Sequence, residues 1–96
     1  MILNFTSANF SFNTGVYYSD PFLLETGDTL MSIELHLGSN GDASLQQSLS
    51  GGVWYDILDT TITCTPFGMQ SFIDCQPGLQ FRLKSTVLFI SASILI

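Results

Sequence analysis

Side chains that could act as nucleophiles or acids are present in this chain, but it has a single His to serve as a base beside them. Nucleophilic catalysis commonly needs a His beside a Ser or Cys, with an acid that orients the His. The one His is His36, which falls on the polar phase of an alternating segment and is expected to face solvent or a partner. Neither Cys64 nor Cys75 lies in a recognisable reactive motif, although a pairing of His36 with either thiol stays open. The residue types therefore favour a protein that is not an enzyme.

The carboxylates stand mainly beside turn residues. Asp56 and Asp59 are three residues apart, and paired carboxylates can serve in glycoside hydrolysis. Asp is also common in turns that have no catalytic role. The segment GSNGD at 38–42 lacks the ligand series and the closing Glu of a calcium loop, and no Cys/His set has the spacing of a zinc site. We therefore expect no catalytic residue, no metal site and no cofactor.

Charge is scarce in this chain, and its balance is acidic. The 96 residues include two Lys or Arg and eight Asp or Glu, for a net charge of −6, and 46% of them are hydrophobic. Phosphate backbones are bound by clustered cations, so the composition opposes nucleic-acid binding. With so little charge, part of the surface is expected to be covered by other subunits, unless uncharged Ser, Thr, Asn and Gln keep it polar.

The sequence carries no signal for a membrane or for export. The longest apolar segment, at 87–96, is shorter than a membrane span requires, and the first residues lack the positive start of a secretory signal. Synthesis in a cytoplasm is the expectation. Cys64 and Cys75 are then expected to be reduced thiols, because reducing compartments disfavour disulfides.

The positioning elements are strands and turns, with no helix of ordinary length. Residues 29–37 alternate apolar and polar side chains, as a half-buried strand does. Gly51-Gly52 separates two β-compatible runs and predicts a hairpin. The expected strands besides 29–37 cover 44–50, 53–57, 60–64, 70–75, 79–85 and 87–96. About seven short strands predict a single small antiparallel β-sandwich, Ig-like or jelly-roll-like.

The sandwich domain is expected to span 15–96, preceded by an N-terminal arm or edge strand at 1–14. Both ends are apolar, and exposed apolar edges invite pairing with other chains. The residues expected to bind partners are Phe5, Phe10, Phe12, Ile94 and Ile96. Trp54, which follows a turn, is expected to anchor the core. A sugar-stacking platform of Trp54 and Tyr55 is the alternative.

Three segments resemble small virion proteins of tailed bacteriophages: SLSGGVWYDI at 48–57, DTTITCTPFG at 59–68 and DCQPGLQFRLKST at 74–86. In that family a Gly or Asp-Gly turn and a Trp motif are followed by a Pro-Gly turn and a strand. The resemblance covers 48–96, and crAss-like phages are the nearest group. Gly51-Gly52 stands where Asp-Gly is commoner, and the N-terminal half carries no family motif.

The resemblance implies a structural virion protein, most simply an auxiliary or decoration protein that binds and stabilises the capsid shell. Its partners would be other virion proteins, either the major capsid protein or fibre subunits, present in many copies. A head-fibre or tail accessory subunit is the alternative within the family. From the residues alone, a carbohydrate- or receptor-binding module that uses Trp54 and Tyr55 stays open.

Overall fold

Alternating apolar residues define the centre of the molecule. In the strand β5 (Met31–Leu37), four alternate side chains are at most 1% exposed: Met31, Ile33, Leu35 and Leu37. The computed structural model describes residues 1–24, 30–73 and 75–96, so the predicted start of this strand at Thr29 lies outside the described residues. The period-2 prediction for this segment is confirmed, because burying one face of a strand requires that spacing.

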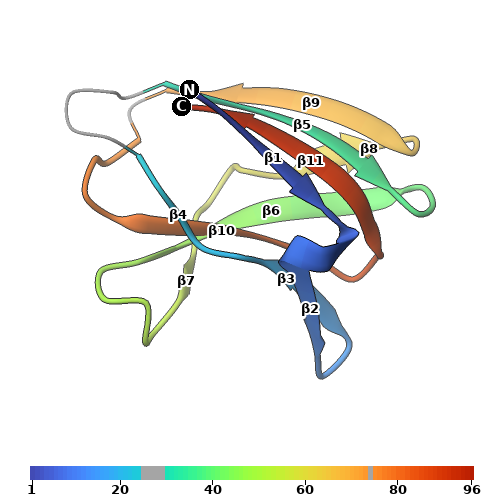
Figure 1. The fold of residues 1–96 in the computed structure, drawn as a ribbon, viewed down its shortest axis with the longest axis horizontal. Helices are drawn as coiled ribbons and strands as arrows, with labels where there is room; N and C mark the ends of the chain where they lie inside the picture. Colours follow the sequence, from blue (N-terminus) through green and yellow to red (C-terminus); the bar gives the residue numbers. More distant parts are fainter. Residues whose placement is uncertain (25–29, 74) are drawn as a thin grey trace.

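Two antiparallel sheets pack face to face around these residues (Figure 1). The first sheet has the order β1 (Ile2–Thr6), β11 (Phe89–Leu95), β5 and β9 (Phe67–Phe72). The second has the order β2 (Phe10–Asn13), β3 (Val16–Ser19), β10 (Gln80–Ser85), β6 (Gly41–Ser48) and β7 (Tyr55–Asp56). Two further strands join it: β4 (Phe22–Leu23) pairs with β10, and β8 (Ile62–Cys64) pairs with β6.

The prediction of an antiparallel β-sandwich is confirmed. The described residues form eleven strands, where about seven were predicted, because several are only two to four residues long and give no periodic signal. The described helical structure is one turn of 3-10 helix, η1 (Ser7–Asn9). No helix among the described residues is long and apolar enough to cross a membrane.

The core lies between the sheets and draws on both. The second sheet contributes alternate residues of β6 and β10, such as Leu45 and Leu83, each at most 1% exposed. The other buried apolar residues are Phe22, Leu24, Ala43, Ile62, Cys64, Phe81, Phe89, Ala92 and Ile94. Burial of these side chains is the main favourable contribution to folding, at about 25 cal/mol per Å² of apolar surface.

A register shift in β11 changes which of its residues face the core. Simple alternation places Leu88, Ile90, Ala92 and Ile94 on one face, but the pairing with β5 shifts between Phe89 and Ser91. As a result Phe89 is 0% exposed and Ile90 is 40% exposed. A β-bulge has this effect because one strand gains a residue that its neighbour does not match.

One side of the sandwich is closed by a direct approach of the two sheets. The chain passes from β8 in the second sheet to β9 in the first, and a Cβ on Gly68 would lie 2.6 Å from the carbonyl oxygen of Thr63. Only glycine allows this distance. The predicted strands 60–64 and 70–75 therefore belong to different sheets, and β9 begins earlier than predicted, at Phe67.

The hairpin predicted around Gly51-Gly52 is present but has a longer loop. β6 pairs with β7 through Gln46 opposite Asp56 and Gln47 opposite Tyr55. Gly51 has a φ of +81°, a conformation that favours glycine.

Residues 1–14 form edge strands of both sheets. β1 pairs with β11 at the edge of the first sheet, and β2 pairs with β3 at the edge of the second. The amide of Ile96 donates to the Met1 carbonyl, and the Met1 nitrogen donates to the Ile96 carbonyl, each at 2.9 Å. Residues 1 and 96 therefore lie side by side (Figure 1).

Candidate functional site

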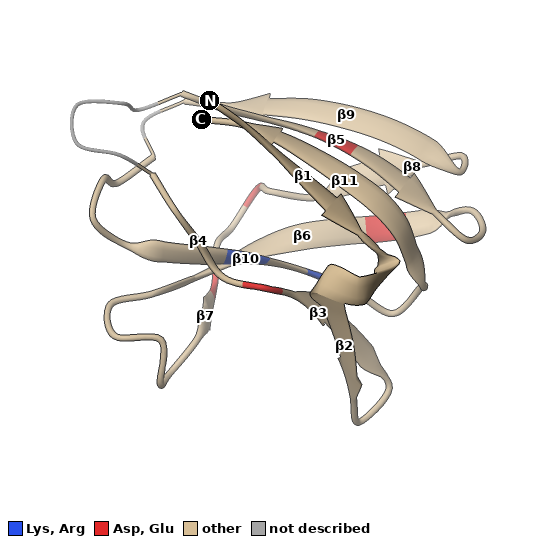
Figure 2. Ribbon diagram, in the orientation of Figure 1, with Lys and Arg blue, Asp and Glu red and all other residues tan. Residues whose placement is uncertain are grey.

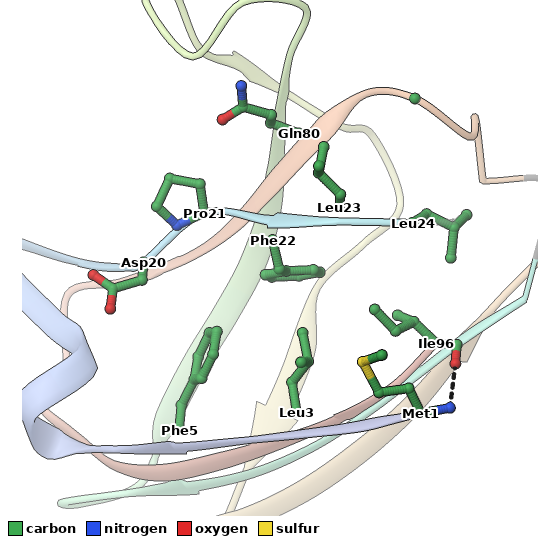
Figure 3. Close-up of a pocket in the computed structure, with 11 residues that line it drawn as sticks. Met1, Leu3, Phe5, Asp20, Pro21, Phe22, Leu23, Leu24, Gln80 and Ile96 are labelled. Atoms are coloured by element: carbon green, nitrogen blue, oxygen red, sulfur yellow. Dashed lines mark hydrogen bonds between the residues drawn. The ribbon is translucent and has the colours of Figure 1, made fainter. Parts of the chain in front are cut away.

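The side of the sandwich opposite Gly68 is open and forms an apolar groove. It runs between β1, at the edge of the first sheet, and β4, the short strand that extends the second sheet (Figure 3). Its volume is about 970 Å³. The lining residues are Met1, Leu3, Phe5, Asp20, Pro21, Phe22, Leu23, Leu24, Gly78, Gln80 and Ile96. This volume lies in the range of ligand and peptide sites.

Inward-facing residues of β1 and β4 form the walls of the groove. Phe5 packs edge-on against Phe22 with ring centroids 6.1 Å apart, and Leu3 points toward the same space (Figure 3). Leu23 is 55% exposed at the rim, whereas Leu24 is 2% exposed. The groove thus offers apolar side chains that the two sheets do not fully cover.

The groove carries a carboxylate at the Thr6 end of β1 and the Met1 ammonium at the other end. Asp20 lines it, and the Nδ2 of Asn9 donates to the Oδ2 of Asp20 at 3.1 Å. The two Lys or Arg side chains of the chain, Arg82 and Lys84, are on β10 in the second sheet (Figure 2). Neither lines the groove.

The residues predicted to bind partners separate into buried and exposed ones. Ile94 is 0% exposed and belongs to the core, so its assignment to a partner surface is wrong. Phe10 is half-buried and stacks on Phe89 at 4.2 Å, so it serves the packing of the chain itself. Phe5 and Ile96 also pack against the core, but both line the groove.

Phe12 lies outside the groove. It is 61% exposed on β2 and packs against the ring of Tyr17, with centroids 4.6 Å apart. Sequence reasoning did not identify Leu3, Asp20, Phe22 or Leu24 as groove residues. The available signal was the apolar run at 22–24 directly after Pro21.

Trp54 does not anchor the core. It is half-buried and stacks on Arg82, whose Cζ lies 4.4 Å from the indole centroid. Tyr18 covers the guanidinium at 4.0 Å, so Arg82 contacts both rings. The prediction is wrong because the register of β7 places Trp54 on the outer face of the sheet. β7 lies at the sheet edge, where Tyr55 pairs with Gln47, and Trp54 directly precedes Tyr55.

A hydrogen-bonded chain continues from Arg82. Its Nε donates to the Oε1 of Gln46 at 2.7 Å, and the Nε2 of Gln46 donates to Asp56 at 3.0 Å. Lys84 forms an ion pair with Asp56 at 2.6 Å. The hydrogen bond from Lys84, with that from Gln46, lowers the pKa of Asp56, and burial lowers the pKa of Arg82. We call Tyr18, Gln46, Trp54, Asp56, Arg82 and Lys84 the outer-face cluster.

The remaining reactive residue types have different surroundings. His36 stacks on Phe67 at 4.1 Å on the outer face of the first sheet. Cys64 is buried in the core, and burial raises the pKa of its thiol. Cys64 and Cys75 are not joined by a disulfide. Within the described part of the chain, no three His, Cys, Asp or Glu side chains gather as metal ligands would.

Comparison with known proteins gave no match: no family model matches the chain, and no curated protein or solved structure is significantly similar to it.

Proposed function

We propose that this chain is a non-enzymatic structural protein of a tailed-phage virion, and specifically an auxiliary or decoration protein that binds and stabilises the capsid shell. The observation that supports binding to another protein is the apolar groove beside the edge strand β1. Exposed apolar grooves of this kind mark interaction sites. The sequence resemblance of residues 48–96 is the reason for proposing a virion as the place of binding.

The virion assignment is tested by mass spectrometry of purified particles of the phage that encodes the chain. The expected result is the chain in the particle in many copies, in a fixed ratio to the major capsid protein. Its absence from purified particles would show that the virion assignment is wrong. Cross-linking within the particle separates the shell from a head fibre or a tail accessory position, because the cross-linked neighbour would be a different protein.

The groove is tested with two matched variants and particle binding. Leu23→Glu places a charge at the rim, where the side chain is 55% exposed. Leu49→Glu makes the same change at a side chain that is 81% exposed outside the groove. Both variants are expected to fold. Each variant is added to particles from which the wild-type protein is absent, and its co-sedimentation with them is measured. Only Leu23→Glu is expected to co-sediment less than wild type. If Leu23→Glu binds the particles as well as wild type does, the role of the groove is contradicted.

A carbohydrate-binding module is the second candidate, favoured by the position of Trp54 on the outer face near Tyr18. Aromatic rings beside polar side chains are typical of sugar sites. Arg82 already contacts both rings, however, so a sugar would have to use their remaining surfaces or displace it. A glycan array with wild-type protein and Trp54→Ala distinguishes the two functions, since a shell protein that uses the groove needs neither the sugar nor Trp54.

A further inference from the structure

We propose that the groove binds an extended segment of the partner protein as an added β-strand, antiparallel to β1. Its alternate side chains would be apolar, and it would carry a Lys or Arg beside Asp20. The inference rests on the function proposed above, because it specifies how the groove holds its partner. Main-chain pairing with a sheet edge is a general mode of peptide recognition.

The hydrogen bonds between β1 and β11 determine which main-chain groups of β1 are available. Met1 and Ile96 exchange both of their main-chain hydrogen bonds. In an antiparallel pair such residues alternate with residues whose N–H and C=O point away from the partner. The register continues with Ile2 opposite Leu95 and Asn4 opposite Ser93. The amides and carbonyls of Ile2 and Asn4 therefore point to the free edge of the first sheet.

Thr6 supports this assignment of directions. By the same alternation its amide points to the free edge, and it donates there to the Oδ1 of Asn9 at 2.9 Å. The adjacent 3-10 turn thus ends the available edge, since its residue Asn9 occupies the amide of Thr6. Within the described residues four main-chain groups have no hydrogen bond and remain for a partner, the N–H and C=O of Ile2 and of Asn4, and an extended backbone satisfies such a row.

Side-chain alternation places the partner's apolar residues in the groove. A residue opposite Leu3 would point to the same face as Leu3, which faces the groove. The residues opposite Met1 and Phe5 would do the same, so three alternate positions of the added strand meet apolar walls. The two positions between them, opposite Ile2 and Asn4, would form the hydrogen bonds and face outward.

Charge complementarity indicates a basic residue in the partner. Among the described residues that line the groove, Asp20 has the one charged side chain, and the Met1 ammonium at the other end of β1 is already bonded to the Ile96 carbonyl. The main-chain amide of Asp20 donates to the Asn9 carbonyl at 2.8 Å, so Asp20 lies at the Thr6 end of β1. The N-terminal end of an antiparallel strand would lie at that end. The expected partner pattern is a Lys or Arg followed by apolar residues at alternate positions.

The test uses a capped synthetic heptapeptide, lysine-threonine-valine-threonine-valine-threonine-valine, titrated into ¹⁵N-labelled protein, so that the lysine and the valines share the face that meets the groove. The expected shifts are in the amides of Ile2 and Asn4 and in residues that line the groove. N-methylation of the second and third threonines, which lie opposite Asn4 and Ile2, removes their donors but keeps every side chain, and it should weaken binding roughly tenfold or more. Equal affinity of the two peptides, absence of binding, or shifts confined to other strands would overturn the proposal.

Variants of the protein test the same edge from the other side. Ile2→Pro removes one outward donor, since no hydrogen bond of the chain uses the Ile2 amide in the described structure, and Pro is tolerated on edge strands. It should lose peptide binding, whereas Ile2→Val should keep it. Asp20→Asn should abolish the preference for the lysine peptide over one that begins with glutamate. An unchanged preference would contradict the charge argument.

The outcomes for this strand addition and for the proposed function are separable. If the peptide fails to bind while Leu23→Glu still reduces particle binding, strand addition is wrong and the role of the groove stands. If Leu23→Glu leaves particle binding unchanged, the groove has no role in that binding, and if the chain is absent from purified particles, the proposed function is wrong even where the peptide binds. Analytical sedimentation gives a further outcome. If wild type is a dimer and Ile2→Pro is a monomer, the proposal is overturned, because a second copy of the chain then occupies the free edge of β1.

Discussion

The guanidinium of Arg82 lies over the indole ring of Trp54, with 4.4 Å between its Cζ and the ring centroid. Arg82 is on β10, and Trp54 directly precedes β7, so the contact holds the end of the β6–β7 loop against the second sheet. Tyr18 of β3 contacts the same guanidinium at 4.0 Å. Residues from three strand regions are thereby joined outside the core.

The first prediction concerns the stability contribution of Trp54. Trp54→Ala should lower the free energy of unfolding by about 1–2 kcal/mol, since a half-buried cation–π contact contributes about that much at most. Phe81→Ala, at a core position that is 2% exposed, should cost about 3–5 kcal/mol. Urea unfolding followed by far-UV circular dichroism measures both. A loss above 3 kcal/mol for Trp54→Ala would mean that the ring anchors the fold after all.

The second prediction is a pH dependence from Asp56. Its pKa in the folded chain is lowered from the ordinary 3.8, chiefly by the hydrogen bond from Lys84. The folded state therefore binds a proton at Asp56 less readily than the unfolded state does. The contribution of Asp56 to stability is complete at pH values above the pKa of Asp56 in the unfolded chain. It is lost as the pH falls through the folded pKa. The carboxylate is 62% exposed, so the effect should be small and should shrink in high salt.

The measurement for Asp56 is the urea midpoint between pH 7 and pH 2. The difference in urea midpoint between wild type and Asp56→Asn should become smaller below about pH 4. Asp59→Asn is the matched control, because Asp59 has no ion pair within the described residues and Asn tolerates its φ of +59°. A difference for Asp56→Asn that is constant across this range would contradict the ion pair.

The third prediction compares two adjacent residues of β11. Ile94 is 0% exposed and Leu95 is 48% exposed. Ile94→Ala should cost about 2–5 kcal/mol, because it leaves a cavity in the core, whereas Leu95→Ala should cost less than about 1 kcal/mol. Calorimetric melting of the two variants checks this. Similar melting temperatures would show that the faces of β11 are assigned incorrectly.

The fourth prediction concerns the approach of the two sheets at Gly68. A Cβ there would lie 2.6 Å from the Thr63 oxygen and 2.8 Å from the Sγ of Cys64. Gly68→Ala should therefore destabilise the chain by roughly 1–3 kcal/mol, as overpacking does. At Gly52 an added Cβ meets only the Ser50 Oγ, at 3.6 Å, so Gly52→Ala should change stability by less than about 0.5 kcal/mol. Equal effects in urea unfolding would argue against close contact of the sheets.

Strands with strong period-2 alternation were predictable from the sequence. β5 and β10 have such alternation between turn residues, and both were predicted nearly to their observed ends. β4 has only two residues and gives no period, so its pairing with β10 could not be expected. The register shift between Phe89 and Ser91 also leaves no pattern in the sequence, since it depends on the pairing with β5.

The candidate site was predictable only in part. Phe5 and Ile96 were expected to meet partners and do line the groove, but its other walls come from Phe22 and Leu24. The groove forms because β1 and β4 lie on opposite sheets, and that relationship is a property of the topology. Trp54 was misplaced for a similar reason, because an aromatic residue after a turn can face either side until the strand register is known.

The central position of β11 has a consequence for biosynthesis. β11 lies between β1 and β5 in the first sheet, although β1 is made first and β11 last of the strands. Until β11 emerges, β1 lacks the one strand that pairs with it among the described residues, and Ile96 is missing from the groove wall. Closing so long a loop of chain is also entropically costly and slow. A chain synthesised only as far as β10 therefore lacks the groove wall that β1 and Ile96 form, and under the proposed function it could not yet bind its partner there.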